Sequence, residues 1–456
     1  MSLSGNPSLV LDNRALYLQK KAQLLSALKQ QKDSTIGLNK ATSNLFRHRL
    51  DKTKSQISLK DFNGVVSLDT ENCLAEVEGV ATYETIVDAL LPHGHMPTVV
   101  PELKTITLGG ATTGVGIESS SFRYGLVHET IAALDLLTSS GDIIECRPDN
   151  EHRNLFYGFP NSYGTLGYAS KLTVKTHPVK KYVRLRHIRH THYKDYFAEL
   201  ERYCKDKETY DFIDGVIFSS DEMYICLATF TDEAPYTSDY TGMNIYFRSL
   251  QQKEEDYIST RDYIWRWDTD WFWCSKFFFA QVPWVRRLYG RDRLRSTTYW
   301  AIRNFCSRYK ITNLLEKISR QPKEMVIQDV EIPVQHSEAF MQFFQKHIGI
   351  SPVWVCPTKV YDPNAQYSLY TMDPDRLYIN FGFWDVVPTT HEDGYHNRLI
   401  EDKVEELKGK KSLYSTSFYS EEKFWKLYNR DLYEELKKKY DPQGKFKNLF
   451  DKCVGN

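Results

Sequence analysis

The sequence lacks most of the features that assign a protein to a class at first sight. It contains no apolar run of about 18 residues, so we expect no membrane-spanning segment, and Met1–Pro7 lacks the basic start and apolar stretch of a signal peptide. Lys plus Arg and Asp plus Glu both number 59, and this balance argues against a nucleic-acid partner. These absences predict a cytoplasmic protein that binds no nucleic acid.

Closely spaced cysteine pairs are missing as well. The eight cysteines are scattered without a C-x-x-C pair, which argues against the common zinc motifs and against a small disulfide scaffold. We therefore expect reduced, mostly buried thiols and no metal site. The cysteines are Cys73, Cys146, Cys204, Cys226, Cys274, Cys306, Cys356 and Cys453.

Neither common phosphate-binding motif is complete in Val99–Glu129, where Gly, Thr and Ser are concentrated. A Walker loop requires a Lys-Ser/Thr pair, and none follows Gly114; a Rossmann fingerprint requires a third glycine where Ser119 stands. The glycines here, Gly109 and Gly110 among them, nevertheless permit φ > 0 and a close approach to a ligand, and successive N–H groups form anion-binding nests. A second small-residue turn at Asn161–Gly167 predicts a clamp around one elongated ligand.

The length predicts two domains, and alternating strand-like and helix-like pieces predict an α+β fold. Leu9–Lys32 has the spacing of an amphipathic helix. Packing of this helix on the protein is favoured over a membrane-surface position, because its polar face is not rich in Arg and Lys with Trp and Phe opposite. Ile131–Thr138 and Ile143–Glu145 predict a β-hairpin, and Glu421–Tyr440 predicts a helix.

The most unusual composition lies in Trp265–Trp300, which holds six Trp, a Phe triplet and a following cluster of arginines. Two interpretations are open. The segment either forms the aromatic core of a second domain, or it forms an apolar entrance for a lipid, flanked by cations that suit anionic headgroups.

The motifs occur in a specific order along the chain: Pro101-Glu102-Leu103, Thr105-x-Thr107-x-Gly109-Gly110, Gly114-x-Gly116-Ile117-Glu118-Ser119-Ser120-Ser121, Tyr124-Gly125 and Asn161-Ser162-Tyr163-Gly164-Thr165-Leu166-Gly167. This order resembles the FAD-binding domain of the vanillyl-alcohol oxidase superfamily, also called PCMH-type, and within it the delta-24 sterol reductase branch. The likeness extends to Val326–Pro333 and Pro352–Pro357.

The resemblance implies a two-subdomain PCMH-type FAD-binding domain with an inserted α+β substrate cap. On this basis we expect an N-terminal helix at 1–32, the FAD-binding domain at 33–182, the cap at 183–435, and a C-terminal segment at 436–456 that returns to the FAD domain. Covalent-flavin members of the family carry His in the loop that corresponds to Thr42–Arg47, or Cys near the second turn. This chain has neither, so we expect noncovalent FAD and a surface role for His48.

The resemblance also implies which residues hold the cofactor. The first glycine segment would run along the ribityl chain and pyrophosphate and donate backbone contacts, while the second turn would flank the flavin and adenosine portions. The expected cofactor-binding residues are Pro101, Glu102, Leu103, Thr105, Thr107, Gly109, Gly110, Gly114, Gly116, Ile117, Glu118, Ser119, Ser120, Ser121, Tyr124, Gly125, Ser162, Tyr163, Gly164, Thr165 and Gly167.

Reduction of an isolated carbon–carbon double bond needs a hydride from the flavin and a proton from a positioned acid. In the strand Val326–Pro333, the period of two puts Ile327, Asp329 and Glu331 on one face and Gln328 on the other. The sterol reductase branch also has Asp at the position of Asp329, which makes it the leading catalytic candidate; the alternative is a structural carboxylate paired with an arginine of the cap. Tyr163, Gln328 and Asn380 are weaker candidates that would line the flavin face.

The resulting hypothesis is an FAD-dependent oxidoreductase that reduces a double bond in an apolar lipid, either a sterol side chain or a methylene-branched fatty acyl chain. NADPH is the expected electron donor. The expected partners are the lipid substrate and, as an open alternative, a membrane surface that a cytoplasmic protein would contact peripherally. The main rival is an FAD-dependent oxidase or dehydrogenase of an alcohol or hydroxy acid; a lipid-binding protein with a degenerate flavin fold is a third option.

Overall fold

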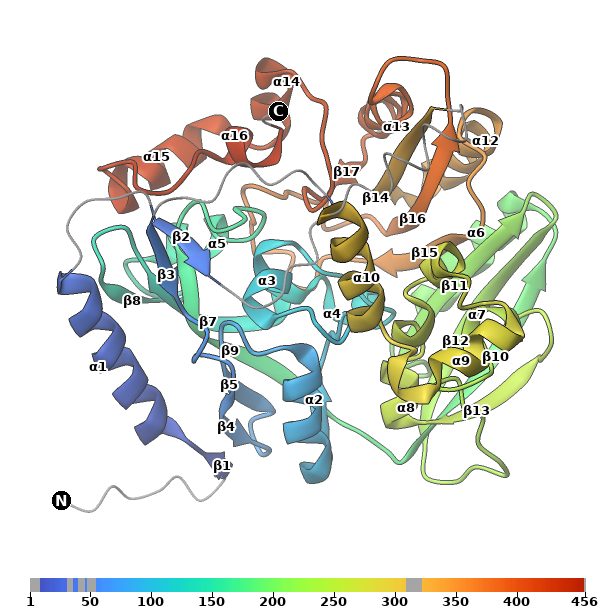
Figure 1. Ribbon diagram of the computed structural model, residues 1–456, viewed down its shortest axis with the longest axis horizontal. Helices are drawn as coiled ribbons and strands as arrows, with labels where there is room; N and C mark the ends of the chain where they lie inside the picture. The colour runs from blue at the N-terminus through green and yellow to red at the C-terminus, as the bar shows by residue number, and fades with distance from the viewer. Residues whose placement is uncertain (1–8, 31–35, 40–45, 47–54, 309–321, 455–456) are drawn as a thin grey trace.

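The computed structural model describes residues 9–30, 36–39, 46, 55–308 and 322–454, and two antiparallel sheets organise them. Figure 1 shows the first sheet on the left, the second on the right and the C-terminal helices above the first. The combination of helices with antiparallel sheets confirms the predicted α+β class. None of the described helices combines the length and the apolarity that a membrane crossing requires.

The first sheet has the strand order β1-β4-β5-β9-β7-β8, and β6 pairs with another part of β9. Its hairpin β7–β8 confirms the predicted one. The strands are β1 Leu9–Asp12, β4 Val65–Asp69, β5 Leu74–Glu78, β6 His95–Pro97, β7 Ile131–Leu137, β8 Ile143–Cys146 and β9 Tyr168–Pro178, with β2 Ile36–Asn39 and β3 Ser55–Ser58 as a separate parallel pair. The helices of this part are α1 Arg14–Gln30, α2 Tyr83–Leu90, α3 Leu108–Thr113, α4 Ser121–Tyr124 and α5 Arg153–Gly158.

The second sheet has the order β13-β10-β12-β11-β15-β16-β14-β17. Its strands are β10 Tyr182–His190, β11 Phe212–Ser219, β12 Glu222–Thr231, β13 Glu255–Ser259, β14 Lys323–Pro333, β15 Val353–Thr358, β16 Tyr378–Pro388 and β17 Lys410–Lys411. The helices around it are α6 Tyr193–Cys204, α7 Tyr246–Ser249, α8 Thr260–Ile264, α9 Pro283–Tyr289, α10 Ser296–Arg308, α12 Ser337–His347 and α13 Tyr395–Glu406.

The N-terminal element differs from the single helix predicted over Leu9–Lys32. Leu9–Asp12 is a strand that pairs with β4, and the helix α1 begins only at Arg14, because main-chain pairing with an existing sheet outweighs the local helical pattern. Tyr17 of α1 is buried and its hydroxyl donates to Asp135 at 2.7 Å, so the helix packs on the protein. Lys32 lies outside the described residues.

The C-terminal helices are α14 Glu421–Leu427, α15 Arg430–Tyr440 and α16 Leu449–Cys453. The predicted single helix over 421–440 is divided at Asn429, which has a φ of 50°. The α15 helix returns to the first sheet, since Lys437 Nζ donates to the Thr165 carbonyl at 3.3 Å and Ser139 Oγ to the Tyr440 carbonyl at 2.9 Å. The chain changes from the first sheet to the second between Pro178 and Tyr182, close to the predicted boundary at 182, while the division into FAD domain and cap stays a prediction.

Candidate cofactor and active site

The first glycine segment is bound to the protein by its own N–H groups. Gly109 N donates to the Gly79 carbonyl at 3.0 Å and Gly110 N to Thr107 Oγ1, the N-cap of α3, at 3.2 Å. Gly114 N and Gly116 N donate to carbonyls within the segment, each at 2.9 Å. These four N–H groups are therefore already used within the protein, and contact of the glycine backbone with a cofactor stays a prediction.

Close packing explains glycine at positions 109, 114 and 116. A Cβ on Gly109 would lie 2.6 Å from the Gly79 carbonyl oxygen, which fixes how tightly α3 approaches the first sheet. The left-handed conformation that the sequence assigned to these glycines is found instead at Val115, with a φ of 50°, and at Gly125, with a φ of 72°.

The second turn has the geometry expected of a ligand-holding backbone. Asn161, Tyr163 and Gly164 have φ values of 61°, 50° and 74°, and left-handed non-glycine residues persist where the surroundings hold them. Asn161 Nδ2 donates to the Leu369 carbonyl at 2.9 Å, but the buried Asn161 Oδ1 and Ser162 Oγ find no hydrogen-bond partner among the described residues. Buried polar atoms without a protein partner fit a bound group that supplies one.

The two glycine segments meet at Tyr163 and Tyr370. A Cβ on Gly114 would come within 3.8 Å of the Tyr163 ring, and Val115 packs in one small cluster with Leu126 and Tyr370. The clamp predicted from the sequence is thus present as two neighbouring segments, and Tyr370 connects them to the second sheet.

Asp329 and Glu331 lie on the face of β14 that is turned toward this junction. Asp329 Oδ1 accepts a hydrogen bond from Asn380 Nδ2 at 3.0 Å, and Glu331 Oε2 accepts one from the Tyr370 hydroxyl. The alternative prediction is that Asp329 pairs with an arginine of the cap. Among the described residues Asp329 has no arginine partner, so the structure does not support this alternative. Sequence periodicity places Glu331 on the same face as Asp329, but the family resemblance does not cover Glu331 and so gives it no role.

Burial gives the two carboxyls different protonation states at neutral pH. It raises the pKa of Asp329 to about 6, with hydrogen bonds from Asn380 and Tyr414 opposing the shift. It raises the pKa of Glu331 to about 8, opposed by the hydrogen bond from Tyr370 and reinforced by the nearby charge of Asp329. Near pH 7 this strand therefore presents an ionised Asp329 and a protonated Glu331.

Gln328 does not belong to this group, contrary to the prediction that it lines the flavin face. Its Nε2 donates to Asn397 Oδ1 of α13 at 2.7 Å. Alternation along β14 turns Gln328 toward α13 with Val330, which packs in the core cluster of α12 and α13.

Glu102 and Glu118, predicted to bind the cofactor, instead form a buried ion cluster with Arg266, which follows α8. Arg266 is 1% exposed, and it pairs with Glu102, with Glu118 at 3.2 Å and with Asp214 of β11 at 2.9 Å. Burial raises the pKa of both glutamates, against the opposing effect of the arginine. This cluster connects the glycine segment to the second sheet.

The other predicted cofactor residues fall into two groups. Three side-chain hydroxyls bond within the protein: Ser119 Oγ to Glu118 at 2.6 Å, Ser120 Oγ to the Thr98 carbonyl at 2.7 Å, and Thr165 Oγ1 to the Ser162 carbonyl at 2.8 Å. The rest line the same two segments, and their contact with a cofactor stays a prediction: Pro101, Leu103, Thr105, Ile117, Ser121, Tyr124 and Gly167. The loop at 42–45, Arg47 and His48, on which the noncovalent linkage depends, lie outside the described residues.

The segment after β17 closes the site from another side. Ser412 N donates to the Asp329 carbonyl at 3.4 Å, and Tyr414 OH accepts from Trp384 Nε1 at 3.0 Å. The buried hydroxyls of Ser412, Ser415 and Ser417 have no hydrogen-bond partner among the described residues. Unsatisfied polar atoms thus gather here and at the second turn, which fits a large bound group with many hydrogen-bonding positions, as FAD is.

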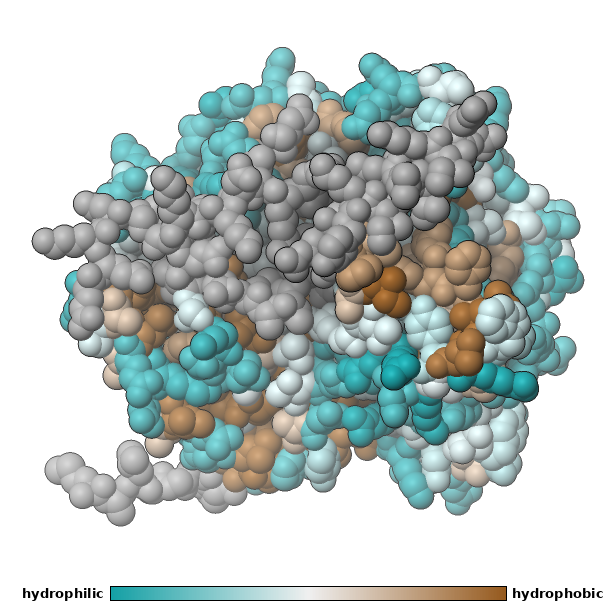
Figure 2. Space-filling model, viewed as in Figure 1, coloured by the Kyte–Doolittle hydropathy of each residue, from teal (hydrophilic) through white to brown (hydrophobic). Residues whose placement is uncertain are grey.

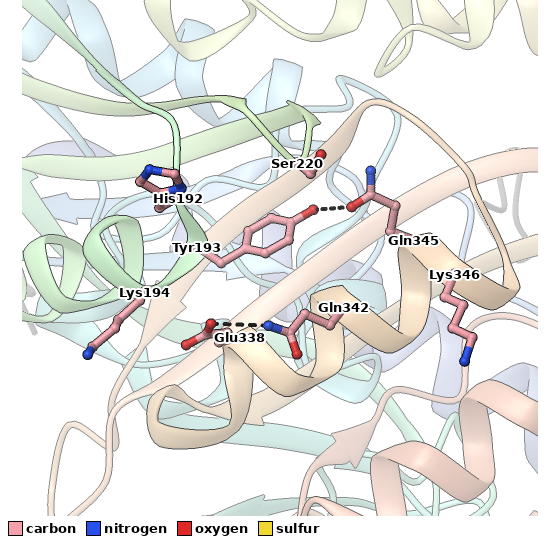
Figure 3. A pocket seen from close by; sticks show the side chains of 8 residues that line it. All are labelled: His192, Tyr193, Lys194, Ser220, Glu338, Gln342, Gln345 and Lys346. Carbon is pink, nitrogen blue, oxygen red and sulfur yellow. Dashed lines mark hydrogen bonds between the residues drawn. The ribbon is translucent and has the colours of Figure 1, made fainter.

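A shallow surface pocket of about 490 Å³ lies elsewhere, between α6 and α12 (Figure 3). Its side chains bond to each other, Tyr193 OH to Gln345 at 2.7 Å and Gln342 Nε2 to Glu338 at 3.1 Å. It contains none of the predicted site residues. It is lined by His192, Tyr193, Lys194, Ser220, Glu338, Gln342, Gln345 and Lys346.

Comparison with known proteins points to the same chemistry. Residues 20–147 match the family model described as an FAD binding domain. The chain is 28% identical over 404 residues to the Delta(24)-sterol reductase of Homo sapiens, covering 85% of this chain and 75% of that protein. It is 26% identical over 439 residues to the Delta(24)-sterol reductase of Arabidopsis thaliana, covering 87% and 76%. A shorter similarity, 22% over 142 residues, covers 31% of this chain and 27% of cytokinin dehydrogenase 9 of Oryza sativa subsp. japonica.

Proposed function

We propose that this chain, which carries an FAD-binding domain and resembles the delta-24 sterol reductases, is an FAD-dependent oxidoreductase that reduces a carbon–carbon double bond in an apolar lipid with NADPH as electron donor. The domain match and the names of the relatives support the flavin and the reaction class. The observation in the structure that carries the proposal is the pair Asp329 and Glu331, whose pKa values lie on either side of pH 7 beside the two glycine segments.

The residues present fit the cofactor. The 161–167 turn and Ser412, Ser415 and Ser417 would hold it through their unsatisfied polar atoms. When bound, FAD supplies the hydride chemistry that no amino-acid side chain provides. The protein supplies binding, orientation and the proton.

The proton requires an acid that is still protonated at the working pH, and Glu331 meets this condition. Saturation of the double bond breaks one carbon–carbon π bond and forms two carbon–hydrogen bonds, with one hydride and one proton consumed and NADPH oxidised to NADP⁺. Glu331 holds a proton on its carboxyl, and the Tyr370 hydroxyl fixes the orientation of that carboxyl. Asp329 acts as a positioning residue, because it holds Asn380 and its negative charge helps to keep Glu331 protonated.

For the substrate we favour a sterol side chain over a methylene-branched fatty acyl chain, because the relatives that match most of the chain are named sterol reductases. The oxidase alternative needs a base in place of an acid. The ionised Asp329 meets that need near pH 7 although Glu331 does not, so the preference for reduction rests on the relatives, which are named sterol reductases.

An anaerobic titration tests the proposal. We expect NADPH to bleach the visible absorbance of the bound flavin, and a sterol with a side-chain double bond to restore it faster than air does. If only a methylene-branched fatty acyl compound restored the flavin absorbance, that compound class and not the sterol would be the substrate. Rapid peroxide formation with an alcohol would overturn the reductase in favour of the oxidase, and purified protein without flavin would contradict both.

Asp329→Asn tests the positioning role. We expect this variant to retain FAD, to turn over more slowly, and to shift the alkaline limb of its pH–rate profile to lower pH by about one unit, since the pKa of Glu331 falls when the neighbouring charge is removed. The control is Asp385→Asn. Asp385 lies on β16 of the same sheet and forms an ion pair with Lys276. An unchanged profile in Asp329→Asn would remove Asp329 from the site.

A further inference from the structure

The aromatic segment divides into a buried part and an exposed part. Trp265, Trp267, Trp271 and Trp273 are core residues, so the core interpretation holds for them. The stretch that follows presents large apolar side chains to solvent, and Figure 2 shows hydrophobic atoms over α9 beside hydrophilic ones. We call the exposed residues the α9 patch: Phe277, Phe279, Trp284 and Leu288, which are 44%, 69%, 66% and 71% exposed.

The α9 helix turns apolar side chains toward solvent and an arginine toward the protein, which is the reverse of an ordinary surface helix. Trp284 and Leu288 are four residues apart and therefore share the outer face, while Arg286 is turned inward. The guanidinium of Arg286 is buried against Asp270 at 2.6 Å, and it also donates to the carbonyls of Gly242 at 2.9 Å and Ala280 at 3.2 Å. A buried, fully paired arginine under an apolar outer face means that the patch is held in place by the fold.

Two exposed arginines without a carboxylate partner accompany the patch, while Arg286, Arg291 and Arg295 are paired with carboxylates. The stretch 283–295 contains five arginines and one acidic residue, Asp292, in a chain with a formal net charge of zero. Arg287 and Arg293 are exposed, and neither has a carboxylate within ion-pairing distance in the part of the chain that the structure describes. Exposed Trp, Phe and Leu beside unneutralised arginines match the chemistry of an anionic bilayer surface, with apolar side chains at the acyl boundary and cations at the headgroups.

We propose that the α9 patch docks the protein on a lipid bilayer that carries anionic headgroups. A series of ring contacts begins behind the patch. The ring centroids of Phe278 and Trp271 are 6.2 Å apart, and those of Trp271 and Phe46 are 5.9 Å apart. Phe46 in turn lies 6.1 Å from Tyr414, which hydrogen-bonds to Asp329. Docking itself does not depend on the proposed reduction, and these packed rings belong to the core that joins the patch to the candidate site.

The test uses the full chain with bound FAD and two kinds of vesicle, phosphatidylcholine alone and phosphatidylcholine with phosphatidylserine, with cosedimentation as the readout. We expect binding to the mixed vesicles that weakens with added salt. Trp284→Ser/Leu288→Ser should lower this binding about tenfold or more. Arg287→Gln/Arg293→Gln should lower it about fivefold for each residue, and should affect phosphatidylcholine vesicles much less. Because binding is measured without turnover, it separates failure of docking from failure of the proposed reaction.

The matched control is Leu18→Ser, a residue of α1 that is 62% exposed. Figure 1 shows α1 on the left of the molecule and α9 on the right. We expect this control variant to bind vesicles like the wild type. Equal binding by Trp284→Ser/Leu288→Ser and wild type would overturn the proposal, provided both retain flavin and helical circular dichroism. It would also be overturned if wild type ignored both vesicles and formed a dimer in analytical ultracentrifugation that the double variant abolishes, because the patch would then join two copies of the chain.

Discussion

Glu331→Gln is expected to lower turnover about 10²- to 10⁴-fold while the protein keeps its fold and its FAD, since the amide cannot donate the proton that the second carbon requires. The measurement is kcat at saturating NADPH and lipid, with the flavin content determined from its absorbance. The control is Glu222→Gln on β12, because Glu222 also accepts a tyrosine hydrogen bond, from Tyr224 at 3.1 Å, but does so at the surface. Full activity in Glu331→Gln would exclude this carboxyl as the acid.

The same variant carries a stability signature. The pKa of Glu331 rises from 4.5 to about 8 on folding, so between these values the folded state binds more protons and stability falls as pH rises. The stabilising effect is fully present below pH 4.5 and is lost as pH rises through about 8. Glu331→Gln should lack this fall, and its free energy of unfolding relative to wild type should therefore be higher at pH 9 than at pH 5.

Arg266→Met is expected to lower the free energy of unfolding by about 3–5 kcal/mol, because it leaves Glu102, Glu118 and Asp214 buried without a counter-charge. Denaturant unfolding monitored by circular dichroism measures the loss. Acidification should restore part of it, since the carboxylates can then become neutral. Arg287→Met, at an exposed site, is the matched control and should change stability by less than about 0.5 kcal/mol. Equal losses in the two variants would contradict a special role for the cluster.

Local sequence patterns were sufficient to predict those features of the fold that depend on one short stretch of the chain. The β7–β8 hairpin and the alternation of β14 follow from neighbouring residues, and the alternation alone put Asp329 and Glu331 on one face. The partner of Glu331 could not be predicted in this way, because Tyr370 lies in an irregular loop after β15 and meets Glu331 only through tertiary packing.

The glycine segment shows a different limit. Its composition indicated close approach correctly, but composition does not say what approaches: at Gly109 it is the Gly79 carbonyl, and at Glu118 it is Arg266. Likewise, the count of tryptophans in 265–300 could not separate buried Trp273 from exposed Trp284, since that difference depends on which face of α9 the buried Arg286 holds inward.

The position of α15 has a consequence for biosynthesis. Lys437 reaches across 272 residues of sequence to the carbonyl of Thr165 in the second glycine turn. On the ribosome, that turn emerges long before the helix that covers it, so the nascent chain carries an unfinished cofactor-binding region while the whole second sheet is being synthesised. The region around the second turn is therefore complete only after α15 has been synthesised and has folded back onto the first sheet.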